Sequence, residues 1–309
     1  MKSRLFAVIF SVFCFANLFA ADLLNFCPDN SFGAGFVDFA ALRQHPQFDA
    51  LLKKSDVKET LDELSAKFGS RVEEWNQGLI FAVNKGDDDP VAGVIFDVPA
   101  LSNLPAALAE LKKNDIVTEY AEKAVAGKPS FVVKFKDEDE KIVITPVAPG
   151  IVICTQEVDS EAILTLKSGN PVALRKQIAE LPEKNTAAWL TGDVALPGDE
   201  GKVDTYKLRS IFKFSDGGKK YSLIGNLVCP NEETSASINM LASMYAGVFN
   251  GVVFNQDPKL GKSFSKCLKL NSKKETFTFK FEITQELVEK VCEYAKAHAQ
   301  DLNVDQLGL

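Results

Sequence analysis

Hydrophobic residues alternate with polar ones over several short stretches, which predicts β-strands. In residues 276–283 every second residue is Phe or Ile and the others are Thr, Lys or Glu. We therefore expect a strand there with one buried and one solvated face, as in antiparallel sheets. Paired apolar runs around acidic or glycine-containing turns predict β-hairpins. These pairs are residues 78–84 with 91–98, 130–136 with 141–147, and the two halves of 206–229.

Other stretches carry apolar residues every three or four positions, which predicts amphipathic helices. They include residues 56–75, the segment that follows Asn103 as its N-cap, residues 231–249 and residues 285–299. Their apolar stripes are Leu61, Leu64, Phe68, Val72 and Trp75; Leu104, Leu108 and Leu111; Ile238, Leu241, Tyr245 and Val248; and Leu287, Val291 and Tyr294.

Two stretches of the chain resemble each other, residues 27–40 and residues 181–195. After each of them the order strand, hairpin, helix, strands, helix follows, which indicates an internal duplication with halves at 22–169 and 170–309. The alternative is chance resemblance, because turns use few residue types. We expect an α+β fold in which antiparallel sheet is covered by helices mainly on one face. The two halves could share one sheet or form two domains.

The N-terminus has the layout of a secretory signal peptide over residues 1–21. Lys2 and Arg4 form a basic start, an apolar run covers Leu5 to Phe15, and small residues stand at Ala20 and Ala21. An uncleaved anchor is the alternative, although the run is shorter than the roughly 20 residues of a membrane span. We expect an exported protein, periplasmic or extracellular, with no membrane span after cleavage.

The charge of the chain disfavours several partners. The full chain carries −7, and removal of the two N-terminal basic residues leaves 33 basic and 42 acidic residues, about −9. A diffuse acidic balance disfavours nucleic acid, which rewards clustered Lys and Arg, and it disfavours adsorption to anionic lipid.

Five cysteines remain after the signal: Cys27, Cys154, Cys229, Cys267 and Cys292. Their number is odd and their spacings are wide, with no C-x-x-C pair. Buried thiols are the first expectation, because Cys often acts as a small hydrophobe. One disulfide is the alternative in an oxidising compartment, with Cys267 and Cys292 as the first pair to check.

The two histidines have structural explanations in the sequence. His298 continues the apolar stripe of the last helix, where an imidazolium suits the negative helix end. His45 precedes Pro46, so it stands in a bend. So few histidines disfavour a His-rich zinc site, and no G-x-S-x-G occurs to support a nucleophile.

Three further motifs are weak. The stretch 260–265, LGKSFS, has the end of a phosphate loop without its first glycine, and we expect an ordinary loop. The glycines of 32–35, FGAG, are expected to serve a turn. The acidic runs 87–89 and 137–140 lack the spacing of a calcium loop and are expected at solvated hairpin tips.

The sequence therefore gives no catalytic, cofactor-binding or metal-binding residue. The first functional hypothesis is a secreted or envelope protein with a non-catalytic binding or structural role, whose partner is an unknown protein or small molecule. One alternative is a carrier of an apolar ligand, which would need a lined cavity. The other is a hydrolase that uses carboxylates alone, since 42 acidic residues leave many pairs open.

Overall fold

A computed structural model shows the fold of the protein. It describes residues 23–43, 62, 65–71, 74–84, 90–136, 138–183, 186, 188–197, 203–215 and 219–298. The chain forms two compact units, Met1–Gly192 and Asp193–Leu309. The proposed signal peptide, His45 and the acidic run 87–89 lie outside the described residues.

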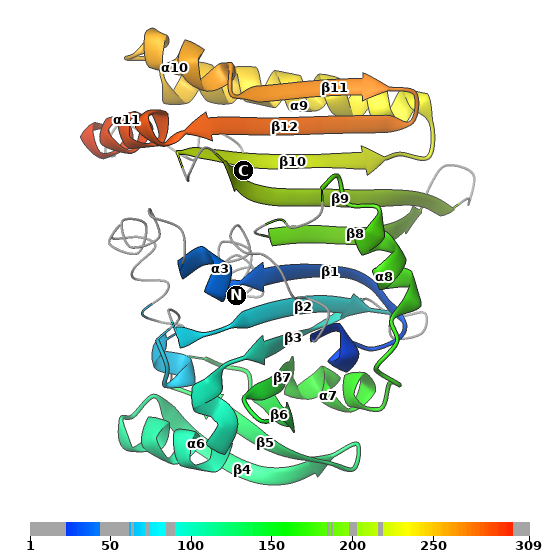
Figure 1. Ribbon diagram of the computed structural model, residues 1–309, viewed down its shortest axis with the longest axis vertical. Helices are drawn as coiled ribbons and strands as arrows, with labels where there is room; N and C mark the ends of the chain where they lie inside the picture. Colours follow the sequence, from blue (N-terminus) through cyan, green and yellow to red (C-terminus); the bar gives the residue numbers. More distant parts are fainter. Residues whose placement is uncertain are drawn as a thin grey trace. The chain divides into compact units, whose positions relative to one another are not determined.

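The first unit contains an antiparallel sheet (Figure 1). Its strands follow one another in the order β8-β1-β2-β3-β7-β6-β5-β4. Their bounds are β1 Ser31–Asp38, β2 Gln77–Val83, β3 Val91–Asp97, β4 Val117–Val125, β5 Lys128–Phe135, β6 Ile142–Ala148, β7 Ile151–Gln156 and β8 Ala188–Pro197. The predicted hairpins β2–β3 and β5–β6 are both confirmed as antiparallel pairs.

Short helices connect these strands and cover parts of the sheet. They are η1 Leu24–Phe26, α3 Phe39–Arg43, η3 Pro99–Asn103, α6 Leu104–Lys113, α7 Glu157–Leu164 and α8 Val172–Ala179. Asn103 caps α6 as predicted, because its side chain accepts a hydrogen bond from the amide of Ala106. The core beside β2 and β3 is aromatic, with Trp75 in edge-on contact with Phe39, Phe68 and Phe96.

The second unit contains strands in the order β9-β10-β12-β11, all antiparallel. The strands are β9 Val203–Ser215, β10 Lys220–Val228, β11 Leu268–Lys273 and β12 Thr276–Thr284, and the helices are α9 Glu232–Val253, α10 Pro258–Ser265 and α11 Gln285–Ala297. The hairpin β9–β10 and the strand β12 are therefore confirmed. β12 alternates in burial only toward its ends, with Phe277 and Ile283 buried and Thr278 exposed, whereas residues 279–282 are all half-buried.

The two sequence halves, 22–169 and 170–309, share part of their order of elements. In each half a strand, β3 or β10, is followed by a helix, α6 or α9, and pairs with a later strand, β7 or β12. A further helix, α7 or α11, then follows that later strand. This common order is what a duplication predicts, and the duplication itself stays a prediction.

The compact units do not coincide with the halves expected from sequence. They divide inside β8, because α8 packs on β1 and residues 188–192 of β8 pair with β1. The mixed α+β class with antiparallel sheet is confirmed.

Two local predictions are wrong. The glycines of 32–35 lie inside β1, where the backbone of β8 comes so close that a Cβ on Gly33 would stand 3.2 Å from the carbonyl oxygen of Thr191. The stretch 260–265 belongs to helix α10, because the Asp257 side chain accepts hydrogen bonds from the first amides of that helix. Leu260 then stands one turn before Phe264 and is buried.

Candidate interaction surface

His298, the histidine that lies within the described residues, makes contacts that are typical of a structural role. His298 follows the last turn of α11 and stacks on Tyr294, with ring centroids 4.3 Å apart. Its Nδ1 lies 2.9 Å from the carbonyl oxygen of Tyr294. These contacts hold the ring at the helix end, as the sequence predicted.

None of the five cysteines, all of which lie in the described part of the chain, forms a disulfide, so the alternative that pairs Cys267 with Cys292 is not realised. Burial raises the pKa of Cys27 and of Cys154 to about 12. A thiol with so high a pKa holds almost no thiolate at neutral pH and is a poor nucleophile. Both therefore act as small core hydrophobes.

Three of the described carboxylates, those of Asp38, Glu138 and Glu140, have local structural roles. Burial raises the pKa of Asp38 to about 6, and its Oδ1 accepts a hydrogen bond from the amide of Ala41 at the start of α3. In the acidic run 137–140, Glu138 forms an ion pair with Lys67 and Glu140 accepts a hydrogen bond from Gln156. Among the described residues, no three His, Cys, Asp or Glu side chains are placed to hold a metal ion.

The most unusual surface of the second unit is helix α9. Asn231 caps it by accepting a hydrogen bond from the amide of Thr234, and Glu232 and Glu233 lie beside its positive end. Between Thr234 and Gln256 the sequence has no charged residue. By length and composition, α9 is the one helix of the described chain that could cross a membrane.

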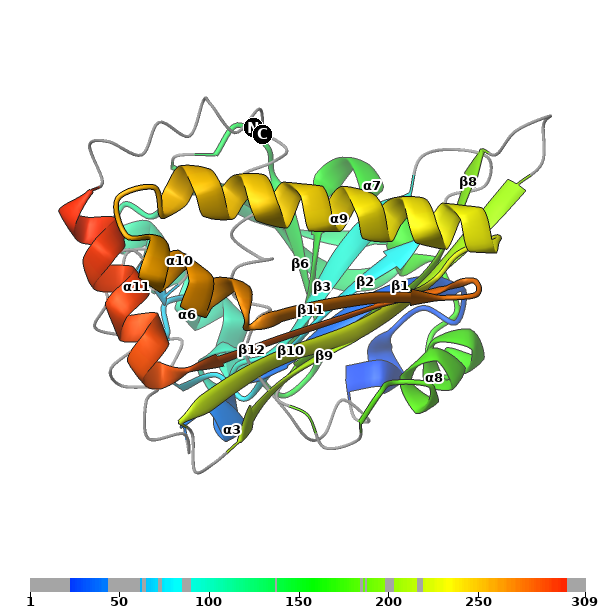
Figure 2. The same ribbon diagram turned by 90° about the horizontal axis from the view of Figure 1, so that it is seen from above.

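The helix is fixed on the strands of its own unit. It lies along β11 and β12 (Figure 2). Near its start, the hydroxyl of Ser235 is fully buried and lies 2.8 Å from that of Ser272 on β11. Ser272 pairs with Phe277, so α9 covers the sheet face that carries the phenylalanines of β12.

The end of α9 is fixed by an apolar cluster. Phe254 is 2 % exposed and packs with Leu260 of α10 and Tyr294 of α11. Helix α10 approaches so closely that a Cβ on Gly261 would stand 2.8 Å from the Cβ of Phe254. This glycine is required by the contact between the two helices.

Between these two ends the half-buried positions of α9 are mostly small or polar, with Ile238, Val252 and Val253 as the larger apolar exceptions. The small or polar ones include Ala242, Ala246, Asn239 and Asn250. The Oδ1 atoms of both asparagines are buried with no hydrogen-bond partner among the described residues. An inward face of this kind contributes little hydrophobic burial.

The side of α9 that faces away from the sheet is apolar. We call it the α9 apolar face and define it as Met240, Leu241, Met244, Tyr245, Val248 and Phe249, which are 67, 45, 52, 58, 48 and 39 % exposed. Of the predicted stripe of this helix, Leu241, Tyr245 and Val248 are exposed, whereas Ile238 is half-buried. An ordinary surface helix turns its apolar side toward the core and its polar side toward solvent, so the orientation of α9 is the reverse.

Two glycines lie along one edge of the α9 apolar face. Gly247 and Gly251 are exposed, and a Cβ on either would meet nothing within 4 Å. Ser243 stands one turn earlier, so three small residues follow one another at intervals of four. Glycine inside a helix costs about 0.5–1 kcal/mol relative to alanine. Contacts among the described residues do not require these two glycines, in contrast to Gly261.

Comparison with family models, with curated protein sequences and with solved structures gives no match. Function is therefore inferred from the residues themselves. Sequence reasoning identified the apolar stripe of α9 but not that this stripe would be left uncovered. The sequence feature that sets this helix apart is the uncharged length from Thr234 to Gln256, with small residues at intervals of four.

Proposed function

We propose that this is an exported, non-catalytic binding protein and that the α9 apolar face is its binding surface. Export rests on the signal-like pattern of residues 1–21. Binding rests on one observation, the six large apolar side chains that α9 presents away from its own sheet.

The exposed area supports a binding role. Side chains of this size offer roughly 150–200 Å² each. At 39 to 67 % exposure, the six present on the order of 500 Å², near the upper end of what a monomer leaves contiguous and exposed. The composition also fits, because Met, Tyr and Phe are enriched at the centres of protein interfaces whereas charged residues are depleted there. Methionine suits such surfaces because its side chain adapts its shape to the partner.

A protein partner fits this face better than a membrane surface. Helices that lie in the lipid interface carry Lys and Arg on a polar face. Helix α9 has neither residue, begins with Glu232 and Glu233, and turns its polar side toward the sheet. Lys269, Lys273 and Lys280 point from β11 and β12 to the opposite face of the sheet, because they alternate with the residues that α9 covers.

The alternatives carried from the sequence have less support. A carrier of an apolar ligand would enclose its ligand in a concavity, whereas the apolar residues of α9 lie on the outer side of a helix. A carboxylate hydrolase would use a carboxyl with a raised pKa in a cleft. Asp38 has such a pKa, but its hydrogen bond to the amide of Ala41 assigns it to the start of α3.

Site-specific photo-crosslinking tests the proposal in the cells that produce the protein. The photoreactive residue p-benzoylphenylalanine is placed at position 244, and at position 109 on the exposed side of α6 as a matched control. We expect a discrete adduct with a polypeptide from position 244 and none from position 109. Equal labelling at both positions, or labelling of lipid alone from position 244, would contradict a protein-binding role.

A further inference from the structure

We propose that the partner of the α9 apolar face is a second copy of this chain, bound antiparallel across a twofold axis. The inference rests on the proposed function, since it names the occupant of the same surface. Homodimers with twofold symmetry are the commonest soluble oligomers, and their interface is one patch that is complementary to itself. The α9 apolar face has the properties that such a patch needs.

The first property is self-complementary spacing. The six residues of the face lie symmetrically about the midpoint between Met244 and Tyr245. In an antiparallel pair centred there, Met240 stands opposite Phe249 of the second copy and Leu241 stands opposite Val248. Met244 stands opposite Tyr245. Each large apolar side chain therefore meets another, and none is left facing a polar residue.

The second property is area. A face on the order of 500 Å² that pairs with its own copy buries about 1,000 Å² in total, which is the size from which specific interfaces begin. Residues at the rim, among them Ala236 and Ser237, are exposed and would add to this area. The face is thus large enough for a reversible dimer of this kind.

The third property is close approach without charge repulsion. Ser243, Gly247 and Gly251 give one edge of the face no bulk, and small residues at intervals of four let two helix backbones come close. The uncharged length of α9 places no like charges opposite each other at the centre of the pair. The antiparallel arrangement sets the positive start of one helix beside the negative end of the other.

Analytical ultracentrifugation of the purified, signal-cleaved chain tests the proposal between about 1 and 200 µM, where interfaces of this size associate. We expect a monomer–dimer equilibrium in this range. Met244→Glu should weaken dimerisation by at least about 100-fold, because two buried carboxylates would lie together at the twofold axis. Ala109→Glu adds the same charge to an exposed position of α6 and should leave the dimer unchanged.

A second variant addresses the edge of the face. Gly247→Leu adds bulk where the chain itself offers open space, so the monomer should fold normally. We expect the dimer to weaken at least about 10-fold, because the two helices would be held apart. Circular dichroism and urea melts of each variant at low concentration establish that the fold is intact.

The remaining outcomes separate this inference from the proposed function. If the wild type is still a monomer at 200 µM but crosslinks from position 244 to another polypeptide, the partner is not a second copy of this chain. The proposed binding role would then stand and the dimer would be ruled out. A monomer that instead sediments with vesicles of phosphatidylethanolamine and phosphatidylglycerol, and loses this binding in Met244→Glu, would overturn both. A monomer with no crosslink and no vesicle binding would also overturn both.

Discussion

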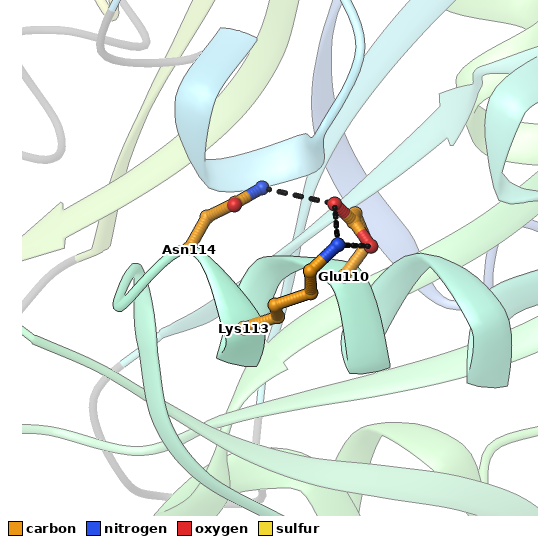
Figure 3. A network of polar contacts seen from close by, with 3 residues as sticks. All are labelled: Glu110, Lys113 and Asn114. Carbon is orange, nitrogen blue, oxygen red and sulfur yellow. Dashed lines mark hydrogen bonds and ion pairs between the residues drawn. The ribbon is translucent and has the colours of Figure 1, made fainter.

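Helices α6 and α9 follow the strands β3 and β10, but they expose opposite sides. Leu104, Leu108 and Leu111 of α6 are 2, 0 and 3 % exposed. The outer side of α6 holds a polar network, in which Lys113 and Asn114 donate hydrogen bonds to Glu110 (Figure 3). In α9 six large apolar residues are exposed, and the half-buried positions carry alanines and asparagines beside Ile238, Val252 and Val253.

The difference shows that an apolar stripe has two possible uses. In α6 the stripe supplies burial to its own unit, and the exposed side needs only to be soluble. In α9 the ends hold the helix in place, through Ser235 and Phe254, and the α9 apolar face stays exposed, as the proposed binding role requires. The fold of the second unit should therefore depend mainly on the ends of α9 and little on its outer face, apart from Phe249, whose ring centroid lies 6.1 Å from that of Phe264 on α10.

The largest expected effect is at the end of α9. Phe254→Ala removes a ring that packs on Phe264 and Tyr294. The free energy of unfolding should fall by about 3–5 kcal/mol, as for aromatic truncation in filled cores. Urea melts at a concentration low enough to keep the chain monomeric measure it. A loss below 1 kcal/mol would mean that α9 is not held by this cluster.

The next effect compares leucines of the two helices. Leu108→Ala in α6 should cost about 2–5 kcal/mol, because the side chain is fully buried. Leu241→Ala in α9 should change the stability of the monomer by no more than about 0.5 kcal/mol. Equal losses would show that the outer face of α9 is packed within the monomer, and the comparison between the helices would fail.

Smaller effects of opposite sign are expected at two glycines. Gly261→Ala brings a methyl group within 2.8 Å of Phe254, so unfolding should become easier by about 1–3 kcal/mol. Gly247→Ala meets open space and should stabilise the monomer by about 0.5–1 kcal/mol through helix propensity. Urea melts of the two variants, each compared with the wild type, measure both changes in the free energy of unfolding. Destabilisation by Gly247→Ala would reveal a contact of this residue within its own chain.

The smallest effect is expected on the outer side of α6. Lys113→Ala removes an ion pair with Glu110 whose side chains are both largely exposed. Exposed pairs of this spacing contribute about 0.3–0.5 kcal/mol, so the melting curve should barely move, and less still in high salt. A larger loss would indicate that the polar side of α6 has a role beyond solubility.

Much of the fold could be predicted from local pattern. The Leu stripe and Asn103 predict α6, and alternation predicts β12, because each signal lies within one element. β4 gave no such signal, since between Val117 and Val125 its residues are mostly exposed on both faces. Helix α10 could have been predicted from Asp257 and Pro258, which begin it in the usual way.

The candidate site could be predicted only in part. Periodicity shows that α9 has an apolar side, but whether that side is covered depends on contacts made elsewhere in the chain. The orientation of α9 follows from the Ser235–Ser272 contact and from the cluster around Phe254, whose members lie far apart in sequence. No window of the sequence contains these contacts, so the outward direction of Leu241 could not be deduced.

Methionine methyl NMR offers the most direct measurement of what covers α9. After signal cleavage, Met240 and Met244 are the only methionines, and both belong to the α9 apolar face. We expect their two ¹³C-methyl signals to shift with protein concentration and to be sheltered from a soluble paramagnetic agent in the dimer. Two signals that stay fixed from low to high concentration, and that broaden fully with the agent throughout, would contradict pairing of the chain through α9.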